Sequence, residues 1–374
     1  MRVVHVFKDY YPPTTGGIEQ HMHVLCGRLA NKMDVAVLVP SRSRSRIEER
    51  VEGVAVVRVP EFGRFASVPL CPTMARELRQ LAPDIVHLHF PNPMGDVAYL
   101  LGTQRVPLVI SYHADIIRQR ALLPLYLPLL ARTFDHARRI VVSSAEYAGL
   151  SPILSRYRDK CSVIPYGVDV QTLALRDGEA SHVEDLRRHH PQGMILFVGV
   201  LRPYKGLEVL LRAMTEVDQG HLVIAGLDPT RGQASGLATR LGLSGRVSFA
   251  GVVSESRLRV LLHACELLVL PSLDRREAFG IVQLEAMACR KPVVSSDLLT
   301  GVRLVNRDGE TGFLVPPGDH VALANAISRL LGDADLRARL GQAARERVIR
   351  QFSADRMVDE TAEVYGHALT SLHE

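Results

Sequence analysis

Short apolar runs alternate with helical patterns along most of this chain. We expect strands at residues 3–7, 35–39, 54–59, 85–89, 108–111, 140–143 and 162–165, and then at 194–199, 222–226, 247–250, 267–270, 292–295 and 313–315. Most of these runs are apolar at successive positions, which is typical of parallel strands that helices cover on both faces. The alternation therefore predicts an α/β fold with parallel sheets.

The strand pattern stops between Gln171 and Gln192, where charged and small residues dominate. The chain, at 374 residues, is also longer than one ordinary core requires. We therefore expect an N-terminal Rossmann-like domain over residues 1–170, a linker over 171–191 and a C-terminal Rossmann-like domain over 192–353. In such folds a cleft is the usual ligand site, so we expect the two parallel sheets to face a central cleft.

The composition excludes several classes of protein. Hydrophobic residues make up 47% of the chain and charged residues 23%, as in globular proteins. No apolar run is long enough to span a bilayer, and the segment 1–7 has a strand pattern rather than the layout of a signal peptide. The five cysteines lack disulfide or zinc spacing, which favours a reducing cytoplasm. The formal net charge of +5 suits nucleic acid, anionic lipid or phosphorylated substrates, without choosing among them.

The segment 275–288 places two glutamates eight positions apart (285 − 277). Apolar positions recur at helical spacing from Gly280 onward, so we expect Glu277 in a strand-to-helix loop and Glu285 inside the helix. If the helix held throughout, the two would be separated by roughly 12 Å at about 1.5 Å per residue and would lie on nearly one face. Two glutamates on a solvated helix face are the alternative interpretation.

The start of this helix is a candidate anion site. The N–H groups of Phe279, Gly280 and Ile281 would lie between the two carboxylates, where the helix dipole favours negative charge. A ligand with hydroxyls at both ends and an anion in its middle fits that arrangement, and a sugar–diphosphate–ribose has this shape.

Two further loops contain candidate phosphate ligands. Arg202 and Lys205 lie three positions apart after the strand at 194–199, where a guanidinium fork and an ammonium can bind a diphosphate. Gly16 and Gly17 open the first helix, where glycines let backbone N–H groups approach a phosphate. The alternatives are a pair of solvated charges and an ordinary turn. His113, just past a strand end with Asp115 nearby, is either a site residue or a structural hydrogen-bonding group.

These motifs resemble glycosyltransferase family 4, a family of retaining enzymes with the GT-B fold. The resemblance covers nearly the whole chain, and it rests on the Gly16-Gly17 loop, the His113 loop, Pro165-Tyr166-Gly167-Val168-Asp169, Gly199-x-Leu201-x3-Lys205-Gly206, Glu277-x7-Glu285 and Val315-Pro316-Pro317-Gly318-Asp319. The segment 296–302 departs from the family pattern and keeps only Gly301 as a glycine. That variant looks like bacterial transferases of surface-polysaccharide assembly, many of which use GDP-mannose or a GDP-deoxyhexose.

The resemblance implies a role for each candidate residue. Catalysis would depend on His113, Glu277, Arg202 and Lys205. The residues implied to bind the donor are Gly16, Gly17, Arg202, Lys205, Gly251, Val252, Glu277, Ala278, Phe279, Gly280, Ile281 and Glu285. Glu277 would hold the transferred sugar, Glu285 the ribose diol, and the basic pair the diphosphate, while the backbone at 251–252 would lie beside the base. No metal or other cofactor is expected.

We therefore predict a retaining transferase that moves a hexose from a nucleotide-diphosphate sugar, GDP-mannose type or UDP type, to a glycan or lipid-linked acceptor. A nucleotide-sugar epimerase and a non-catalytic nucleotide-sugar-binding module remain as alternatives. A nucleic-acid role is disfavoured because the basic residues are not interleaved with aromatics. We expect the protein in the cytoplasm, including the inner face of the membrane.

Three further segments carry expectations. The segment Arg118–Arg139 is basic and leucine-rich, and it is either a core helix or a surface that contacts anionic lipid. Asp333-Ala334-Asp335 is interpreted as a helix cap rather than a metal site. By the same family resemblance, we expect the last helix, within 354–374, to cross back onto the first domain.

Overall fold

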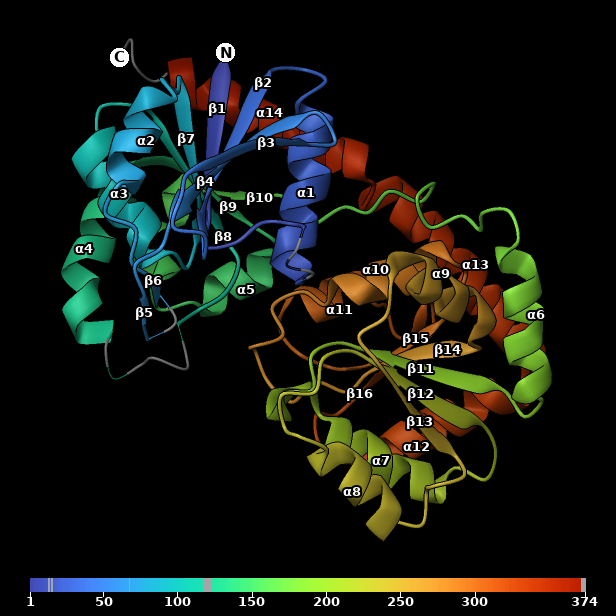
Figure 1. The fold of residues 1–374 in the computed structure, drawn as a ribbon. Coiled ribbons are helices and arrows are strands. Elements are labelled where there is room, and N and C mark those ends of the chain that lie inside the picture. The colour runs from blue at the N-terminus through green and yellow to red at the C-terminus, as the bar shows by residue number, and fades with distance from the viewer. Residues whose placement is uncertain (13, 15, 67, 117–120, 122, 371–374) are drawn as a thin grey trace. The chain divides into compact units, whose positions relative to one another are not determined.

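The computed structural model describes residues 1–12, 14, 16–66, 68–116, 121 and 123–370, and it divides into two α/β units (Figure 1). Unit 1 comprises Met1–Gly167 and Ala354–Glu374, and unit 2 comprises Val168–Ser353.

Unit 1 is built on an eight-stranded sheet in the order β10-β9-β8-β7-β1-β2-β4-β3. Its strands are β1 (Arg2–Val6), β2 (Asp34–Ser41), β3 (Ile47–Val51), β4 (Val54–Pro60), β7 (Ile85–Phe90), β8 (Leu108–Tyr112), β9 (Ala137–Val142) and β10 (Cys161–Val163). All neighbours pair in parallel except β3, which is antiparallel to β4. The helices are α1 (Gly17–Leu29), α2 (Met74–Gln80), α3 (Pro93–Gly102), α4 (Leu123–His136), α5 (Ala145–Leu150), the 3-10 helix η2 (Leu154–Lys160) and α14 (Ala354–Thr370).

Strand β3 and the small hairpin of β5 (Arg64–Phe65) and β6 (Val68–Pro69) were not expected from the apolar pattern. Strand β3 has three charged residues in its middle and lies at the sheet edge, where such side chains remain in solvent. The turn that joins β3 to β4 is Glu52-Gly53, and both residues have positive φ, 47° and 88°. Two such residues between strands are a hairpin signal, so the turn rather than the hydrophobicity identifies this strand.

Helix α14 completes the core of unit 1. Its residues Met357, Val358, Val364 and Tyr365 are buried in the same apolar cluster as residues of β1, β2 and α1. Arg28 and Lys32 of α1 form ion pairs with Asp355 and Asp359 of α14, and Figure 1 shows the two helices in blue and red within this unit. Because 3.6-residue spacing places its apolar residues on one side, α14 covers the sheet with a single face.

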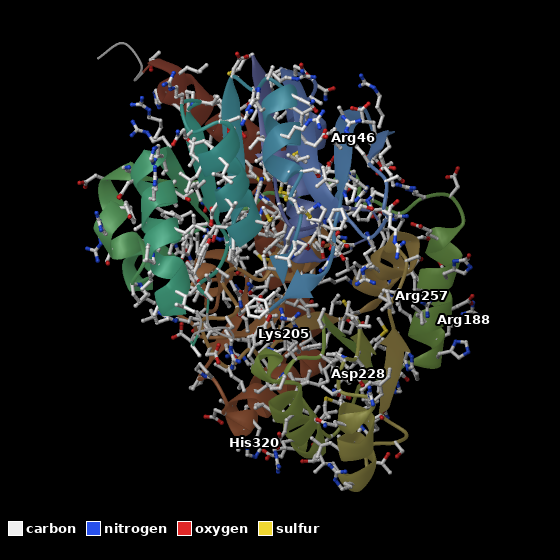
Figure 2. All side chains as sticks on the ribbon, turned by 60° about the vertical axis from the view of Figure 1, so that its left-hand side comes forward. Arg46, Arg188, Lys205, Asp228, Arg257 and His320 are labelled. Atoms are coloured by element: carbon white, nitrogen blue, oxygen red, sulfur yellow. The ribbon has the colours of Figure 1, made fainter. Side chains whose placement is uncertain are left out.

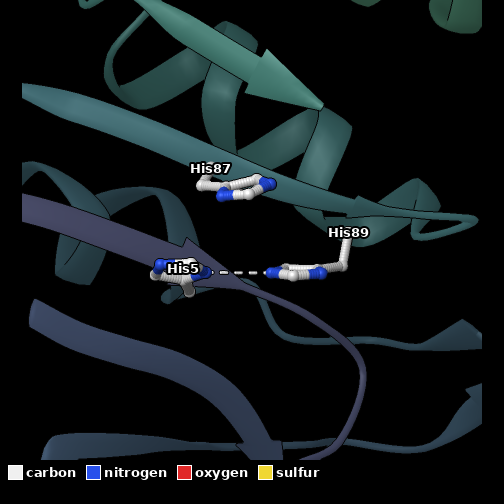
Figure 3. Close-up of side chains that lie close together, drawn as sticks. All are labelled: His5, His87 and His89. Carbon is white, nitrogen blue, oxygen red and sulfur yellow. Dashed lines mark hydrogen bonds between the residues drawn. The ribbon is translucent and has the colours of Figure 1, made fainter. Parts of the chain in front are cut away.

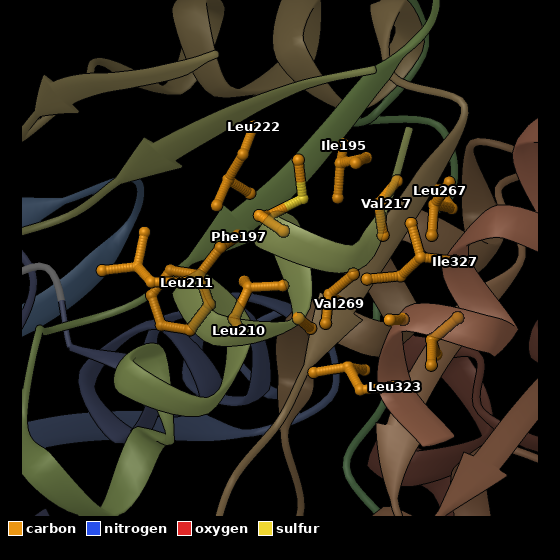
Figure 4. Packing of buried hydrophobic residues seen from close by; sticks show 14 of the residues in the cluster. Ile195, Phe197, Leu210, Leu211, Val217, Leu222, Leu267, Val269, Leu323 and Ile327 are labelled. Atoms are coloured by element: carbon orange, nitrogen blue, oxygen red, sulfur yellow. The ribbon is translucent and has the colours of Figure 1, made fainter. Parts of the chain in front are cut away.

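Unit 2 has a six-stranded parallel sheet in the order β13-β12-β11-β14-β15-β16. Its strands are β11 (Met194–Val198), β12 (His221–Ala225), β13 (Val247–Gly251), β14 (Leu267–Leu270), β15 (Val293–Ser296) and β16 (Gly312–Val315). The helices are α6 (Glu179–His189), η3 (Pro203–Lys205), α7 (Leu207–Glu216), α8 (Gln233–Arg240), α9 (Glu255–Ala264), α10 (Ile281–Ala288), α11 (Gly301–Val305), α12 (His320–Gly332) and α13 (Ala334–Gln351). Figure 4 shows the apolar core in which Phe197, Leu210 and Ile327 are fully buried.

The segment 171–191, expected to be a linker, instead belongs to unit 2 and contains helix α6. The Glu179 carboxylate at the start of α6 accepts hydrogen bonds from Nε and Nη2 of Arg259 on α9, at 2.8 and 2.6 Å, and from Ser256 Oγ at 2.7 Å. This buried ion pair fixes a helix whose outer face is otherwise polar. The polar composition of the segment therefore reflects a surface helix rather than a free connection.

Two smaller expectations concern helix ends and the membrane. The Asp333 side chain accepts a hydrogen bond from the Leu336 N–H and caps α13, so the helix-cap interpretation is confirmed. Among the described helices, none is both long enough and apolar enough to cross a bilayer.

Candidate functional site

The strand order of unit 2 reverses between β11 and β14. From β11 the sheet continues through β12 and β13 on one side, and from β14 it continues through β15 and β16 on the other. Open parallel sheets bind ligands beyond the carboxyl ends of the two strands that flank such a reversal. The loops that follow these strands carry Lys205 and Glu277, so the candidate site begins with this pair.

Lys205 and Glu277 form a buried ion pair. Lys205 Nζ lies 2.5 Å from Glu277 Oε2, and the two side chains are only 14% and 8% exposed. Ser272 Oγ donates a second hydrogen bond to the same oxygen, at 2.8 Å. Among the described residues, Glu277 Oε1 has no hydrogen-bond partner, so this oxygen can accept from a ligand hydroxyl. Burial alone would lower the pKa of Lys205, but the facing carboxylate outweighs it and holds that pKa above its ordinary value.

Close backbone approach brings these two loops together. The Leu273 N–H donates to the Tyr204 carbonyl at 2.8 Å, which joins η3 to the loop after β14. Gly206 has φ +71°, and a Cβ at this position would lie 1.9 Å from the Pro271 carbonyl oxygen. Only glycine fits there, because it has no side chain and tolerates positive φ. The Lys-Gly dipeptide therefore places the ammonium beside the glutamate.

The two arginines near the pair have different roles. Arg276 is bound to Asp274 through its Nε and Nη2 atoms, and its guanidinium lies 5.0 Å from the centre of the Tyr204 ring. It is thus a structural clamp for the loop. Arg202 caps η3 and is exposed, and its guanidinium forms no side-chain hydrogen bond within the described part of the chain. Arg202 is therefore the cation that remains available to an anionic ligand.

Helix α10 begins at Ile281, with Gly280 as its N-cap at φ +74°. Glu277 is therefore outside the helix, as expected from the sequence, and the separation of roughly 12 Å that assumed a continuous helix does not apply. A Cβ at Gly280 would lie 2.6 Å from Leu270 Cδ2 and 2.9 Å from Gln283 Nε2, so the turn packs tightly against the end of β14. The helix N-terminus consequently lies next to the strand end that carries Ser272 and Glu277.

Glu285 lies one turn into α10 and is partly buried. Burial, reinforced by the neighbouring Glu255 charge, raises the pKa of Glu285 to about 7. The Glu285 carboxylate has no hydrogen-bond donor among the described residues. A half-buried carboxylate without a donor is costly, and a pair of ligand hydroxyls would satisfy it.

The loop between the two glutamates is fixed by Gly301. The Gly301 N–H donates to the Ala278 carbonyl at 2.8 Å, and a Cβ on Gly301 would lie 2.3 Å from Phe279 Cδ2. Phe279 is itself buried and packs edge-on against Phe352. This contact explains why a glycine remains at position 301 in a segment that otherwise departs from the family pattern.

A cavity of about 100 Å³ opens at the ends of β11, β12 and β13, and the residues that line it are Leu201, Ile224, Gly226, Asp228, Ser235, Phe249 and Gly251. Gly251 has φ +66°, and its carbonyl accepts from the Gly226 N–H at 2.7 Å. Val252 follows and is exposed. Figure 2 labels Asp228 and Lys205 on this unit. The cavity has mostly apolar walls, which suit a flat heterocycle. Its one carboxylate, Asp228, already accepts hydrogen bonds from Thr230 and from the Gly232 N–H.

In unit 1, Gly16 is the N-cap of α1 and Gly17 its first residue. A Cβ at Gly16 would lie 2.1 Å from the Glu19 carboxylate, which folds back over the helix start. Burial raises the pKa of Glu19. The N-terminus of α1 is thus covered by an acidic side chain of its own helix. Sequence reasoning missed Glu19, although an acidic residue in the first helical turn is a known capping signal.

His113 is almost fully buried in unit 1, at 3% exposure. Its Nδ1 lies 2.5 Å from the Tyr166 hydroxyl and its Nε2 lies 2.8 Å from His89 Nδ1. Both ring nitrogens therefore have protein partners, and Asp115, which we considered as its orienting group, instead accepts from Tyr112 and Ser151. The His113 side chain is therefore a member of a larger hydrogen-bond network.

The candidate site residues thus fall into two sets. Unit 2 holds Arg202, Lys205, Gly251, Val252, Glu277, Ala278, Phe279, Gly280, Ile281 and Glu285 around the β11 and β14 loops and α10, whereas Gly16, Gly17 and His113 lie in unit 1. Ser272 and Tyr204 were missed. Ser272 lies two positions after the last residue of β14. A polar residue at the carboxyl end of a parallel strand is a candidate ligand-binding residue, and this signal was available in the sequence.

Two family profiles match consecutive parts of the chain. The profile described as Glycosyltransferase Family 4 matches residues 15–172, and the profile described as Glycosyl transferases group 1 matches residues 180–347. The chain is 34% identical over 376 residues to the O-antigen chain mannosyltransferase C of Escherichia coli, with 99% of this chain and 100% of that protein covered. It is 36% identical over 361 residues to the D-rhamnosyltransferase WbpZ of Pseudomonas aeruginosa, with 95% and 93% covered.

Solved structures share the fold. The sucrose-phosphate synthase of Thermosynechococcus elongatus superposes with a TM-score of 0.81 at 22% identity, covering 99% of both chains. Anabaena HepE in complex with UDP and glucose superposes with a TM-score of 0.79 at 21% identity, covering 98% of this chain and 99% of that one. At these identities the likeness establishes the GT-B glycosyltransferase fold.

Proposed function

Because this chain belongs to glycosyltransferase family 4, we propose that it transfers a hexose, with retention of configuration, from a nucleotide-diphosphate sugar to a glycan or lipid-linked acceptor. The observation that supports this most is the Lys205–Glu277 pair at the strand reversal of unit 2, with Glu285 eight positions farther along. A cation, an oxygen free to accept a hydroxyl and a second carboxylate match the three parts of such a donor.

Charge development explains the role of each group. As the bond between sugar and phosphate breaks, positive charge grows on the sugar and negative charge grows on the leaving diphosphate. Lys205, Arg202 and the N-terminus of α10 would stabilise the diphosphate, and preorganised groups of this kind usually supply the largest part of catalysis. Glu277, held by Lys205 and Ser272, would orient the sugar hydroxyls through Oε1.

Glu285 and the cavity at β11–β13 would hold the nucleoside. The Glu285 carboxylate would accept both ribose hydroxyls, and the base would enter the cavity beside Gly251 and Val252. We propose a guanine nucleotide with mannose or a related deoxyhexose, since the two relatives above are named as a mannosyltransferase and a rhamnosyltransferase. A UDP sugar is the alternative, because HepE was solved with UDP and glucose.

The reaction we propose uses no metal. The phosphate-binding charge would come from the side chains of Arg202 and Lys205 and from the helix N-terminus. A leaving-phosphate oxygen would accept the proton of the acceptor hydroxyl, so that no side-chain base is needed on the reacting face of the sugar. This route keeps the new bond on the face from which the diphosphate departs.

The acceptor would bind unit 1 at a membrane surface. The core-helix interpretation of residues 118–139 fails for the first half of α4, where Leu125 is 82% exposed and Leu127 is 43% exposed, while Leu130 and Phe134 are buried. Positions 118–120 and 122 of that segment lie outside the described residues. Exposed leucines on the same helix as the exposed Arg132 suit peripheral contact with anionic lipid at the inner face of the membrane.

A donor panel tests the proposed function. Purified protein is incubated with GDP-mannose, GDP-rhamnose, UDP-glucose or ADP-glucose and a polyprenyl-diphosphate oligosaccharide, and the released nucleotide and the anomeric configuration of the product are measured. We expect transfer from a GDP sugar with the α-linkage retained. Inverted product would refute the proposed mechanism, and transfer from UDP-glucose alone would refute the guanine assignment.

The same assay separates the remaining alternatives. A nucleotide-sugar epimerase would change its substrate in the absence of acceptor, and a binding module would retain donor without turnover on any acceptor. Liposome sedimentation tests the membrane contact. The variant is Leu125→Glu on α4, and the control is Leu101→Glu, which changes an exposed leucine on α3. Binding that ignores anionic lipid would refute peripheral attachment.

A further inference from the structure

Four histidines on or next to the central strands of unit 1 have fully or almost fully buried side chains. His5 lies on β1, His87 and His89 lie on β7, and His113 directly follows β8. Parallel neighbours bring them together, because β7 pairs with β1 on one side and with β8 on the other. Burying so many polar rings is costly unless each ring nitrogen has a hydrogen-bond partner. Here every ring nitrogen has one, and the hydrogen bonds follow one another from ring to ring.

Six hydrogen bonds join these rings into one chain. From one end, the Tyr166 hydroxyl lies 2.5 Å from His113 Nδ1, and His113 Nε2 lies 2.8 Å from His89 Nδ1. His89 Nε2 lies 2.9 Å from His5 Nδ1, the contact marked in Figure 3, and His5 Nε2 lies 3.2 Å from the Tyr365 hydroxyl. The Tyr365 hydroxyl lies 2.6 Å from His87 Nδ1, and His87 Nε2 lies 2.8 Å from Ser111 Oγ at the other end.

A metal ion would not account for this arrangement as well. His5, His87 and His89 offer nitrogens within 4.8 Å of one another. However, the His87 and His89 rings are stacked with their planes 14° apart, so their lone pairs run side by side rather than toward one point. The His89 and His113 rings are nearly coplanar at 5°, which is the geometry of an in-plane N–H···N hydrogen bond.

Neutral imidazole has one donor nitrogen and one acceptor nitrogen, so the tautomers along such a chain cannot be chosen independently. If one ring reversed alone, two protons would face each other at one neighbour and two lone pairs at the other. The three directly linked rings, His113, His89 and His5, must therefore all carry the proton on Nε2 or all carry it on Nδ1. His87 follows the same choice through Tyr365, because the one proton of that phenol has no partner other than His5 and His87 among the described residues. The terminal phenol selects between these, because a phenol donates more strongly than it accepts and Tyr166 faces His113 Nδ1.

We propose that Tyr166, His113, His89, His5, Tyr365, His87 and Ser111 form one polarised hydrogen-bond chain in which every histidine carries its proton on Nε2. The chain makes Tyr365 of α14 a positioning residue for the His113 loop. Its members lie on both segments that lead to unit 2: Tyr166 precedes Gly167, the last residue before unit 2, and Tyr365 lies on α14, which starts directly after unit 2. The chain thereby holds both connecting segments against the same strands.

The catalytic consequence rests on the proposed function. If unit 1 presents the acceptor, the loop that contains His113 must keep one geometry during transfer, and the chain fixes that loop from α14. Loss of a link would then slow transfer without weakening donor binding, because the residues proposed to hold the donor diphosphate and ribose lie in unit 2.

Nitrogen NMR of histidine-labelled protein tests the chain without any substrate. Long-range proton–nitrogen spectra at about pH 7.5 should show Nε2–H tautomers for His5, His87, His89 and His113. Nitrogen–nitrogen couplings should cross the hydrogen bonds from His113 to His89 and from His89 to His5. A mixture of tautomers, an imidazolium or a shared Nδ1–H form would overturn the proposal.

Tyr365→Phe tests the relay, and Tyr99→Phe is its matched control. Tyr99 is equally buried in unit 1, and among the described residues its hydroxyl bonds to the carbonyls of Gln104 and Val106 and to no histidine. We expect Tyr365→Phe to shift the ring nitrogens of His5, His89 and His113 together, and Tyr99→Phe to shift none of them. Unchanged His113 signals in Tyr365→Phe would overturn the relay. Should that variant not fold, Ser111→Ala, which removes the terminal acceptor, takes its place in the same comparison.

Kinetics test the positioning role. In Tyr365→Phe we expect kcat to fall about tenfold, the size of effect that loss of one hydrogen bond can have, with the donor KM changed less than about twofold. A kcat equal to that of Tyr99→Phe would overturn the positioning role. If the wild-type protein transferred sugar from none of the donors, the proposed function would be refuted instead. The NMR result would still test the hydrogen-bond chain, because it does not depend on transfer.

Discussion

Lys205 and Glu277 lie 72 positions apart in the sequence, and their side chains meet in an ion pair at the strand reversal of unit 2. The pair leaves one carboxylate oxygen open and keeps the ammonium close to the N-terminus of α10. Lys205 therefore has two tasks, since it holds Glu277 in place and adds positive potential where a diphosphate would bind. Substitutions of the two residues should therefore affect stability and sugar transfer differently.

Replacing Glu277 by glutamine should abolish sugar transfer and weaken the fold. The neutral amide would lack the charge that matches Lys205, so a buried cation would remain without its partner, at a cost of about 3 kcal/mol in the free energy of unfolding. We expect kcat/KM to fall by about 1,000-fold or more, the size of effect typical of losing one preorganised electrostatic group. Urea unfolding and donor turnover measure the two effects.

The double variant Lys205→Met/Glu277→Gln separates those effects. It removes the unpaired charge, so it should be more stable than Glu277→Gln while remaining inactive. Glu208→Gln on α7 is the control, since Glu208 forms an exposed ion pair with Arg212. Near-normal turnover in Glu277→Gln would contradict the assigned role of this carboxylate.

Arg202→Ala should weaken donor binding and leave the fold unchanged. The Arg202 side chain is exposed and has no hydrogen-bond partner among the described residues, so its removal leaves nothing buried unsatisfied. One charge-assisted contact to the diphosphate should be lost, raising the donor KM about tenfold. Arg240→Ala, at the last turn of α8, is the control. Equal donor KM values in the two variants would exclude Arg202 from the site.

Glu285 should make donor affinity depend on pH near neutrality. Its pKa is raised to about 7, so the carboxylate becomes protonated as the pH falls from about 8 to about 6 and accepts ribose hydroxyls less well. We expect the donor Kd, measured by calorimetry, to rise over this range. In Glu285→Gln the affinity should be weak at both pH values, and an unaltered pH response in this variant would contradict the assignment.

The same raised pKa gives a stability prediction of opposite sign. The folded state holds the Glu285 proton up to about pH 7, whereas an unfolded glutamate loses it near 4.5. Stability from this residue is therefore lost as the pH rises through that window, because the folded chain must hold a partly buried charge. Glu285→Gln should raise Tm relative to wild type at about pH 8, and the gain should disappear at about pH 5.

The sequence predicted the central strands and their order along the chain well, because their side chains are apolar on both faces. Thirteen expected strands are present, and β3, β5 and β6 were missed, since β3 is charged and the other two have only two residues each. Helix α6 was mistaken for a linker for a related reason. Its buried contact with α9 includes an ion pair, which hydrophobic periodicity does not register.

The sequence indicated which residues to consider for the site, but not which of their side chains contact one another. The spacing of Glu277 and Glu285 located a loop and a helix, but it could not show that Lys205 would bind Glu277 directly. That contact depends on Gly206 approaching Pro271, a tertiary relationship between separate loops. His113 was expected as a single side chain, and its membership of a chain of rings depends on the pairing of β1, β7 and β8.

The buried histidines of unit 1 should make the fold sensitive to mild acid. Burial lowers the pKa of His5 and His21 to about 3, and it holds the pKa values of His87, His89 and His113 well below the ordinary 6.5. Below pH 6.5 the unfolded chain therefore binds protons that the folded chain does not, and stability falls as the pH falls. Each histidine contributes up to about 1.4 kcal/mol per pH unit.

Urea unfolding at about pH 7.5, 6.5 and 5.5 measures this effect. We expect the midpoint to change little between the first two values and to fall steeply at the third. His182→Gln on α6 is a control, because this exposed histidine should leave the acid response as it is. If the urea midpoint did not change down to about pH 5.5, the buried histidines would have to bind protons in the folded state, which would contradict this prediction.

The place of α14 after unit 2 in the sequence has a consequence for biosynthesis. On a ribosome, the strands of unit 1 emerge before unit 2, but the residues that complete their core, Met357, Val358, Val364 and Tyr365, are made only after all of unit 2. Unit 2 lies between the two segments of unit 1 in the sequence. It can therefore fold while part of the apolar surface of unit 1 is still exposed. Until α14 is made, the nascent chain therefore exposes apolar surface of unit 1 that is prone to aggregate.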